Sequence, residues 1–143
     1  MKLTEKKLKG KFVIAYDTLC TGWDCMMDGE EGDKNYAPTL FKSEDEAFAE
    51  IFDGNLAMLE SHADGDGEQL EEYNEGVTME MIEEMNKINS SGDVKAMREF
   101  MDKNPQCDDQ GEWVEPAETF IMNRKAVFGD IGLEITGTKI TDL

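Results

Sequence analysis

The stretch from Ser43 to Met85 contains no lysine or arginine, although it contains 15 of the 33 acidic residues of the chain. Helix surfaces usually mix the two signs of charge, because Glu–Lys pairs three or four residues apart add a few tenths of a kcal/mol. Like charges at that spacing, such as Glu46 and Glu50, are mildly destabilising. The pattern therefore acts against local stability, and any helix formed here must present an acidic side opposite its apolar side.

The first predicted helix covers residues 43–61. Ser43 followed by Glu46 is a capping box, which marks the start of a helix. The apolar residues after it recur at helical spacing: Phe48, Ile51, Phe52, Leu56 and Leu59. At about 100° per residue, four acidic residues fall within about 40° of one direction on the opposite side: Glu46, Glu50, Asp53 and Glu60.

Two further helices and several strands complete the expected fold. One helix begins at Thr78, and another contains Val94 and Met97 and stops at Asn104-Pro105. Residues 11–19 and 36–41 are expected to form a hairpin with a long loop, residues 106–115 a loop, and segments 119–122, 126–128, 133–136 and 138–141 two or three strands. The order β-β-α-α-α-β-β predicts an α+β fold with a small antiparallel sheet.

Length and charge limit the class of protein. A chain of 143 residues favours a single domain over 1–143. The net charge of −19 repels nucleic acid and anionic membranes and attracts basic proteins, so we expect no direct nucleic-acid or membrane binding. The sequence has no apolar run long enough to span a membrane and no signal-peptide pattern, and it has an odd number of cysteines. We therefore expect a cytoplasmic protein.

The residues able to support catalysis or bind zinc are few. His62 is the only histidine, and its position at the end of the first helix indicates a structural role. Cys20, Cys25 and Cys107 would complete a Cys₃His set with His62, but they form no CxxC pair. Free cysteine is more often a small buried hydrophobe. We expect no catalytic residue, no metal site and no cofactor.

The segment from Asp64 to Glu75 partly resembles a calcium-binding loop. Asp64, Asp66, Glu68 and Glu75 occupy ligand positions of an EF-hand loop. Gln69 stands where the sharp turn requires glycine, and Glu71 occupies the position that is normally apolar. The motif is therefore not fulfilled, and a solvated linker, with weak adventitious cation binding as the alternative, is the favoured interpretation.

The acidic face predicts a protein that binds a basic, nucleic-acid-binding partner and blocks its groove. This is how anti-restriction and anti-CRISPR proteins of phages and mobile elements act as nucleic-acid mimics. The expected partner-binding residues are Glu46, Glu50, Asp53, Glu60, Glu71, Glu72, Glu80, Glu83 and Glu84, with Trp23 and Tyr36 as aromatic anchors.

Other functions remain open at this point. An immunity protein that neutralises a basic nuclease toxin would use the same acidic face. A small metal-dependent enzyme would use the cysteines and His62, and a housekeeping protein would be acidic for solubility alone. A homodimer is a further alternative, in which the basic segment Lys2 to Lys11 pairs with the acidic stretch of a second copy.

Overall fold

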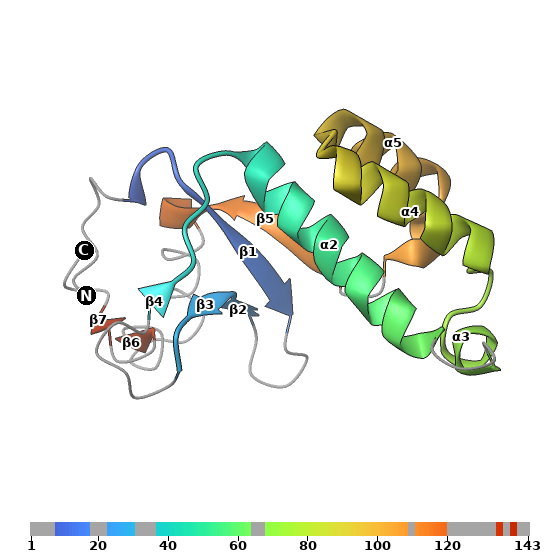
Figure 1. The fold of residues 1–143 in the computed structure, drawn as a ribbon. Helices are drawn as coiled ribbons and strands as arrows, with labels where there is room; N and C mark the ends of the chain where they lie inside the picture. The colour runs from blue at the N-terminus through green and yellow to red at the C-terminus, as the bar shows by residue number, and fades with distance from the viewer. Residues whose placement is uncertain are drawn as a thin grey trace. The chain divides into compact units, whose positions relative to one another are not determined.

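The computed structural model divides the chain into two compact units, each with its own hydrophobic core (Figure 1). The sheet unit comprises Met1–Ala47 and Glu112–Leu143, and the helical unit comprises Phe48–Gly111. The structure describes residues 8–17, 23–30, 37–63, 68–108, 111–119, 134–135 and 138–139. This division into units does not test whether residues 1–143 fold as one domain, so the single domain expected from the sequence stays a prediction.

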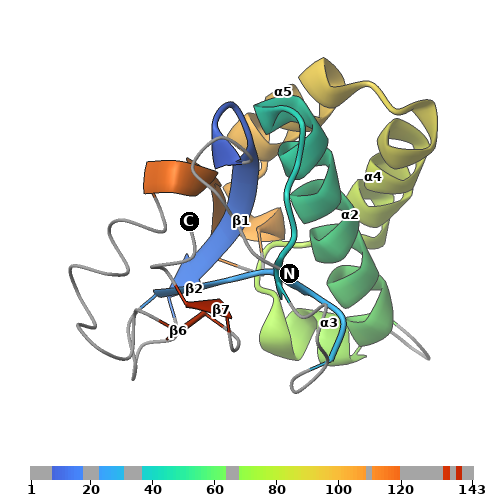
Figure 2. The ribbon, with the colours of Figure 1, turned by 90° about the vertical axis from the view of Figure 1, so that its left-hand side faces the viewer.

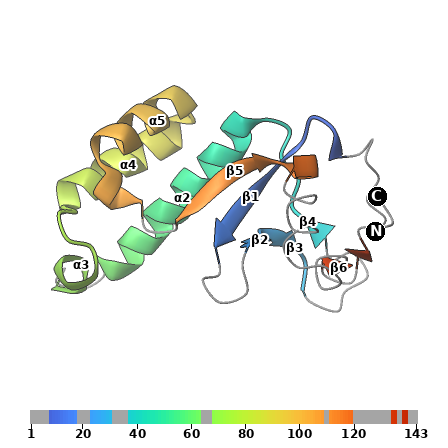
Figure 3. The ribbon, with the colours of Figure 1, turned by 180° about the vertical axis from the view of Figure 1, so that it is seen from behind.

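The sheet unit is built around β1 (Phe12–Asp17), which pairs antiparallel with β2 (Trp23–Cys25) on one side and β5 (Glu112–Pro116) on the other (Figures 1 and 3). Ala15 lies opposite both Cys25 and Trp113. Alternate residues of β1 point to one face, where Val13 and Ala15 are fully buried against Cys25. Ile14, which points to the opposite face, is also buried, and the β-branched and aromatic residues of β1 suit such a central strand.

Two short hairpins accompany this sheet. β3 (Met27–Asp28) pairs with β4 (Ala37–Pro38), and β6 (Glu134–Ile135) pairs with β7 (Thr138–Lys139). The last pair confirms the strands expected within 133–141. The hairpin expected between 11–19 and 36–41 is wrong in its pairing, since the strand partners of β1 are β2 and β5. Phe41 meets β1 through an isolated bridge to Phe12.

The helical unit contains most of α2 (Glu44–His62), followed by α3 (Glu68–Tyr73), α4 (Met79–Ser91), α5 (Val94–Lys103) and the 3₁₀ turn η1 (Pro105–Cys107). Side-chain caps explain where three of these helices begin. The hydroxyls of Ser43 and Thr78 and the carboxylate of Asp93 each accept a backbone N–H of the first turn. Gly92, with φ of 69°, ends α4 in the left-handed conformation.

The core of the helical unit lies between α2, α4 and α5, which Figure 2 shows packed beside one another. Phe52, Leu59, Met85 and Met97 are at most 2% exposed. The rings of Phe52 and Phe100 meet edge to face, with centroids 6.1 Å apart and planes at 87°. The methionines therefore fill gaps around an aromatic pair, as their helical spacing predicts.

The α+β class and the three long helices are confirmed, and two local predictions are corrected. The loop expected over 106–115 contains most of β5, and part of the expected linker Asp64–Glu75 is α3. The strand expected over 119–122 lies outside the described residues except for Thr119, which is helical; residues 126–128 lie wholly outside them. Among the described residues, no helix has the length and apolar character required to span a bilayer.

Candidate functional site

Two asparagines of α4 donate hydrogen bonds to two carboxylates of α2. Asn89 Nδ2 lies 2.9 Å from Asp53 Oδ1, and Asn86 Nδ2 lies 3.0 Å from Glu60 Oε1. From the first bond to the second, the residue number rises from 53 to 60 on α2 and falls from 89 to 86 on α4. The two helices therefore run antiparallel, as Figures 1 and 2 also show. The amides bridge the helices without neutralising either carboxylate.

Two more carboxylates extend this line of charge. Glu50 lies one turn before Asp53 on α2, and Glu83 lies one turn before Asn86 on α4. All four acidic side chains are exposed. We call Glu50, Asp53, Glu60 and Glu83 the acidic seam. Along α2 its carboxylates cover about 15 Å of helix axis.

The described residues supply no neutralising cation to the acidic seam. None of its four carboxylates forms an ion pair with a lysine or arginine in the part of the chain that the structure describes. The helical unit as a whole contains 17 acidic and four basic residues, a net charge of −13. Three of the four basic residues belong to α5, namely Lys95, Arg98 and Lys103.

The remaining acids of α4 lie further around that helix from Asn86 than Glu83 does. Glu80 lies about 60° around α4 from Glu83, and Glu84 lies about 100° from Glu83. Lys87 points within about 20° of Glu80. Glu80, Glu83 and Glu84 therefore share one side of α4, and their role in partner binding stays a prediction.

The other predicted binding residues lie outside the acidic seam. Glu46 is exposed in the first turn of α2, in the sheet unit, and its carboxylate accepts the backbone N–H of Lys42 at 3.2 Å. Glu72 is exposed on α3, and Glu71 belongs to the same helix. Trp23 is the first residue of β2, and Tyr36 lies outside the described residues.

An exposed tyrosine stands beside this acidic region, and sequence reasoning missed it. Tyr73 ends α3 and is 63% exposed. Its ring packs against the ring of His62, with centroids 5.6 Å apart. His62 Nδ1 in turn lies 2.6 Å from Nδ2 of Asn74, which is buried. The structure thus gives the only histidine of the chain a packing contact and a hydrogen-bond partner.

The described cysteines lie in hydrophobic cores. Cys25 is fully buried in the core of the sheet unit, where its Sγ lies 3.6 Å from Met27 Sδ. Cys107 is fully buried in the core of the helical unit, and burial raises the pKa of its thiol. A thiol with a raised pKa is a poor nucleophile and metal ligand at neutral pH. Cys20 lies outside the described residues.

Metal ligands do not converge in the described part of the chain, where no three His, Cys, Asp or Glu side chains are placed to hold an ion. Cys20 of the rejected Cys₃His set and Asp64 and Asp66 of the calcium-like loop lie outside the described residues. For both, the expectation that no metal site exists stays a prediction.

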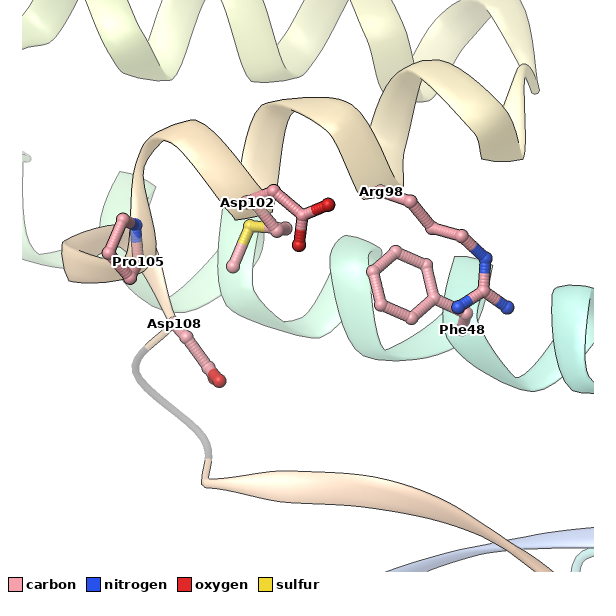
Figure 4. Close-up of a pocket in the computed structure, with 6 residues that line it drawn as sticks. Phe48, Arg98, Asp102, Pro105 and Asp108 are labelled. Atoms are coloured by element: carbon pink, nitrogen blue, oxygen red, sulfur yellow. The ribbon is translucent and has the colours of Figure 1, made fainter.

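A pocket of about 320 Å³ lies on the α5 side of α2 (Figure 4). The guanidinium of Arg98 stands 4.4 Å from the centre of the Phe48 ring. Asp108, also on the pocket wall, accepts a hydrogen bond of 3.3 Å from the buried Asn55. Phe48 lies about 140° around α2 from Asp53, so this pocket of mixed charge is separate from the acidic seam.

No protein-family model, curated protein or solved structure matches this chain.

Proposed function

We propose that this protein is an acidic inhibitor that docks its helical unit into the basic groove of a nucleic-acid-binding protein. The observation that supports this most directly is the acidic seam: four exposed carboxylates on two adjacent helices, two of them held in place by asparagines and none paired with a lysine or arginine that the structure describes. A protein that needed acidity for solubility alone would gain stability by placing lysines where Asn86 and Asn89 stand.

The electrostatics suit a nucleic-acid groove. Carboxylates three or four residues apart on a helix lie about 5–6 Å from one another, and a DNA strand carries one charge per about 3.4 Å. A basic groove responds mainly to negative potential, so a loose match in spacing is sufficient. The net charge of −13 on the helical unit also accelerates the approach of a basic partner. Such an inhibitor acts in the cytoplasm without a cofactor and catalyses no reaction.

A neutralised variant tests the proposal. Glu50→Gln, Asp53→Asn and Glu60→Gln together remove three charges, while the side-chain carbonyls of the new residues still accept the bonds from Asn86 and Asn89. The wild-type protein is first used at low and high salt to retain partners from a lysate. Each retained protein is then purified, and its binding to labelled DNA or RNA is measured as the inhibitor is added.

We expect the wild-type protein to displace nucleic acid from its partner, less effectively as salt rises, and the triple variant to lose at least tenfold in potency. A matched control carries Glu30→Gln, Glu99→Gln and Asp102→Asn, which remove the same charge from exposed positions that do not belong to the acidic seam. Equal loss of potency in both variants would show that the net charge of the protein, and not the acidic seam, determines inhibition. Retained potency in the triple variant would contradict the proposal.

A further inference from the structure

We propose that the docking surface has an apolar anchor at the corner between α3 and α4, and that the ring of Tyr73 there receives an arginine side chain of the basic partner. The inference rests on the proposed function, because it names the chemistry with which that surface recognises its partner. It concerns Tyr73 and Met79, two residues to which the acidic seam assigns no role.

Among the described residues of the helical unit, three large apolar side chains are exposed, and Tyr73 and Met79 are the two most exposed of them. Large apolar side chains that are exposed in the described structure are Met58 at 39%, Tyr73 at 63% and Met79 at 49%. Tyr73 and Met79 lie on either side of a tight turn, in which the N–H of Val77 donates to the carbonyl of Asn74. Met58 lies about 140° around α2 from Asp53, away from the acidic seam.

Met79 connects the corner to the acidic seam. Met79, Glu83 and Asn86 are spaced four and three residues apart on α4, so they form one stripe along the side of that helix that faces Asp53 and Glu60. A partner that covers Glu83 therefore also covers Met79. An apolar residue next to carboxylates suits a partner whose basic side chains surround an apolar contact.

Tyr73 is held in position before any partner arrives. Its ring lies against His62, which contacts the buried amide of Asn74 at 2.6 Å. A side chain that is already ordered loses little conformational entropy on binding. Fixed, amphipathic tyrosines of this kind are typical of binding hot spots.

Charge selects the group that packs on this ring. Glu72, Glu75 and Glu80 are exposed around the corner. A guanidinium stacks on an aromatic face and bonds carboxylates in two places at once, whereas an ammonium does neither as well. The same unit already uses this pairing internally, where Arg98 stands over Phe48.

Two synthetic peptides of equal length test the inference, one alternating arginine with serine and the other lysine with serine. Their affinities for the full chain are measured by calorimetry in buffer of low ionic strength. We expect the wild type to bind the arginine peptide about fivefold more tightly than the lysine peptide. Tyr73→Leu, which keeps an apolar side chain without a ring, reduces this preference about threefold, while Tyr73→Phe retains it.

The Met58→Leu variant is the matched control and leaves the preference unchanged, and far-UV circular dichroism verifies that each variant is folded. A preference for arginine that survives Tyr73→Leu overturns the inference but leaves the proposed function standing, since the acidic seam still attracts the partner. If the wild type binds neither peptide, the anchor is refuted as well. The neutralised triple variant tests the proposed function separately, through displacement of nucleic acid.

Discussion

Asn89 of α4 donates its side-chain N–H to the carboxylate of Asp53 on α2, across a distance of 2.9 Å. Together with the bond from Asn86 to Glu60, it connects two helices that also pack through the core beneath them. The amide satisfies one acceptor site of the exposed carboxylate without adding a compensating charge. The acidic seam thus depends on neutral donors for its geometry.

The first prediction concerns the free energy of this bond. Asn89→Ala and Asp53→Ala are each expected to lower the free energy of unfolding by about 0.5–1.5 kcal/mol. The double variant should lose less than the sum of the two, by about 0.5 kcal/mol, because the bond can be removed only once. Urea denaturation of the four proteins measures this coupling, and strictly additive losses would show that the bond contributes nothing in solution.

The second prediction places a cation where the structure has an amide. Asn86→Lys brings an ammonium beside Glu60 and is expected to raise the free energy of unfolding by up to about 0.5 kcal/mol. The same change should weaken binding to a basic partner about tenfold, since it reverses part of the local potential. Met58→Lys, which adds the same charge at an exposed position about 140° around α2 from Asp53, is the control for binding. Unchanged affinity for Asn86→Lys would place the binding surface elsewhere.

The third prediction concerns the core of the helical unit. Phe52→Ala is expected to lower the free energy of unfolding by about 3–5 kcal/mol, because Phe52 is fully buried and packs edge to face on Phe100. Met79→Ala, at an exposed position, should change it by less than about 0.5 kcal/mol. Thermal denaturation compares the two variants, and similar losses would contradict the packing described for this unit.

The fourth prediction is a pH dependence from Cys107. Burial raises the pKa of this thiol from the ordinary value of 9.0, so the folded state keeps its proton at a pH where the unfolded state releases it. This stabilisation is complete below pH 9.0 and is lost as the pH rises through the folded-state pKa, by up to about 1.4 kcal/mol per pH unit.

Cys107→Ala tests that dependence by removing the titrating thiol. As the pH rises above 9.0, the variant should lose less free energy of unfolding than the wild type. If the wild type and Cys107→Ala lost the same free energy of unfolding, the pH dependence would come from titratable groups other than Cys107. A thiol-specific reagent should also modify Cys107 slowly at pH 8 and much faster once urea unfolds the chain.

The sequence predicted the parts of the fold that local interactions determine. The helix after Ser43 and those after Thr78 and Asp93 begin with capping side chains and continue with apolar residues at helical spacing, both of which are visible in the sequence. β5 was missed because Glu112 and Glu115 give it the composition of a loop. It becomes a strand through pairing with β1, which lies about 100 residues earlier and which no local pattern can reveal.

The candidate surface could be predicted only in part, for a similar reason. Glu50, Asp53 and Glu60 share one face because they share one helix. Which residues of α4 lie beside them depends on how the two helices pack, and this packing places an asparagine, Asn86, rather than a lysine next to Glu60. The exposure of Tyr73 depends on the turn after α3, and tyrosine is as often buried as exposed.

The pairing of Phe12 with Pro116 has a consequence for how the protein is made. As the chain leaves the ribosome, β1 emerges long before its second neighbour, and every residue of the helical unit emerges in between. Domains generally fold as units during synthesis, and contacts distant in sequence form late. The helices can therefore pack while one edge of β1 is still unpaired, so a chain truncated before residue 112 should contain a folded helical segment attached to an incomplete sheet.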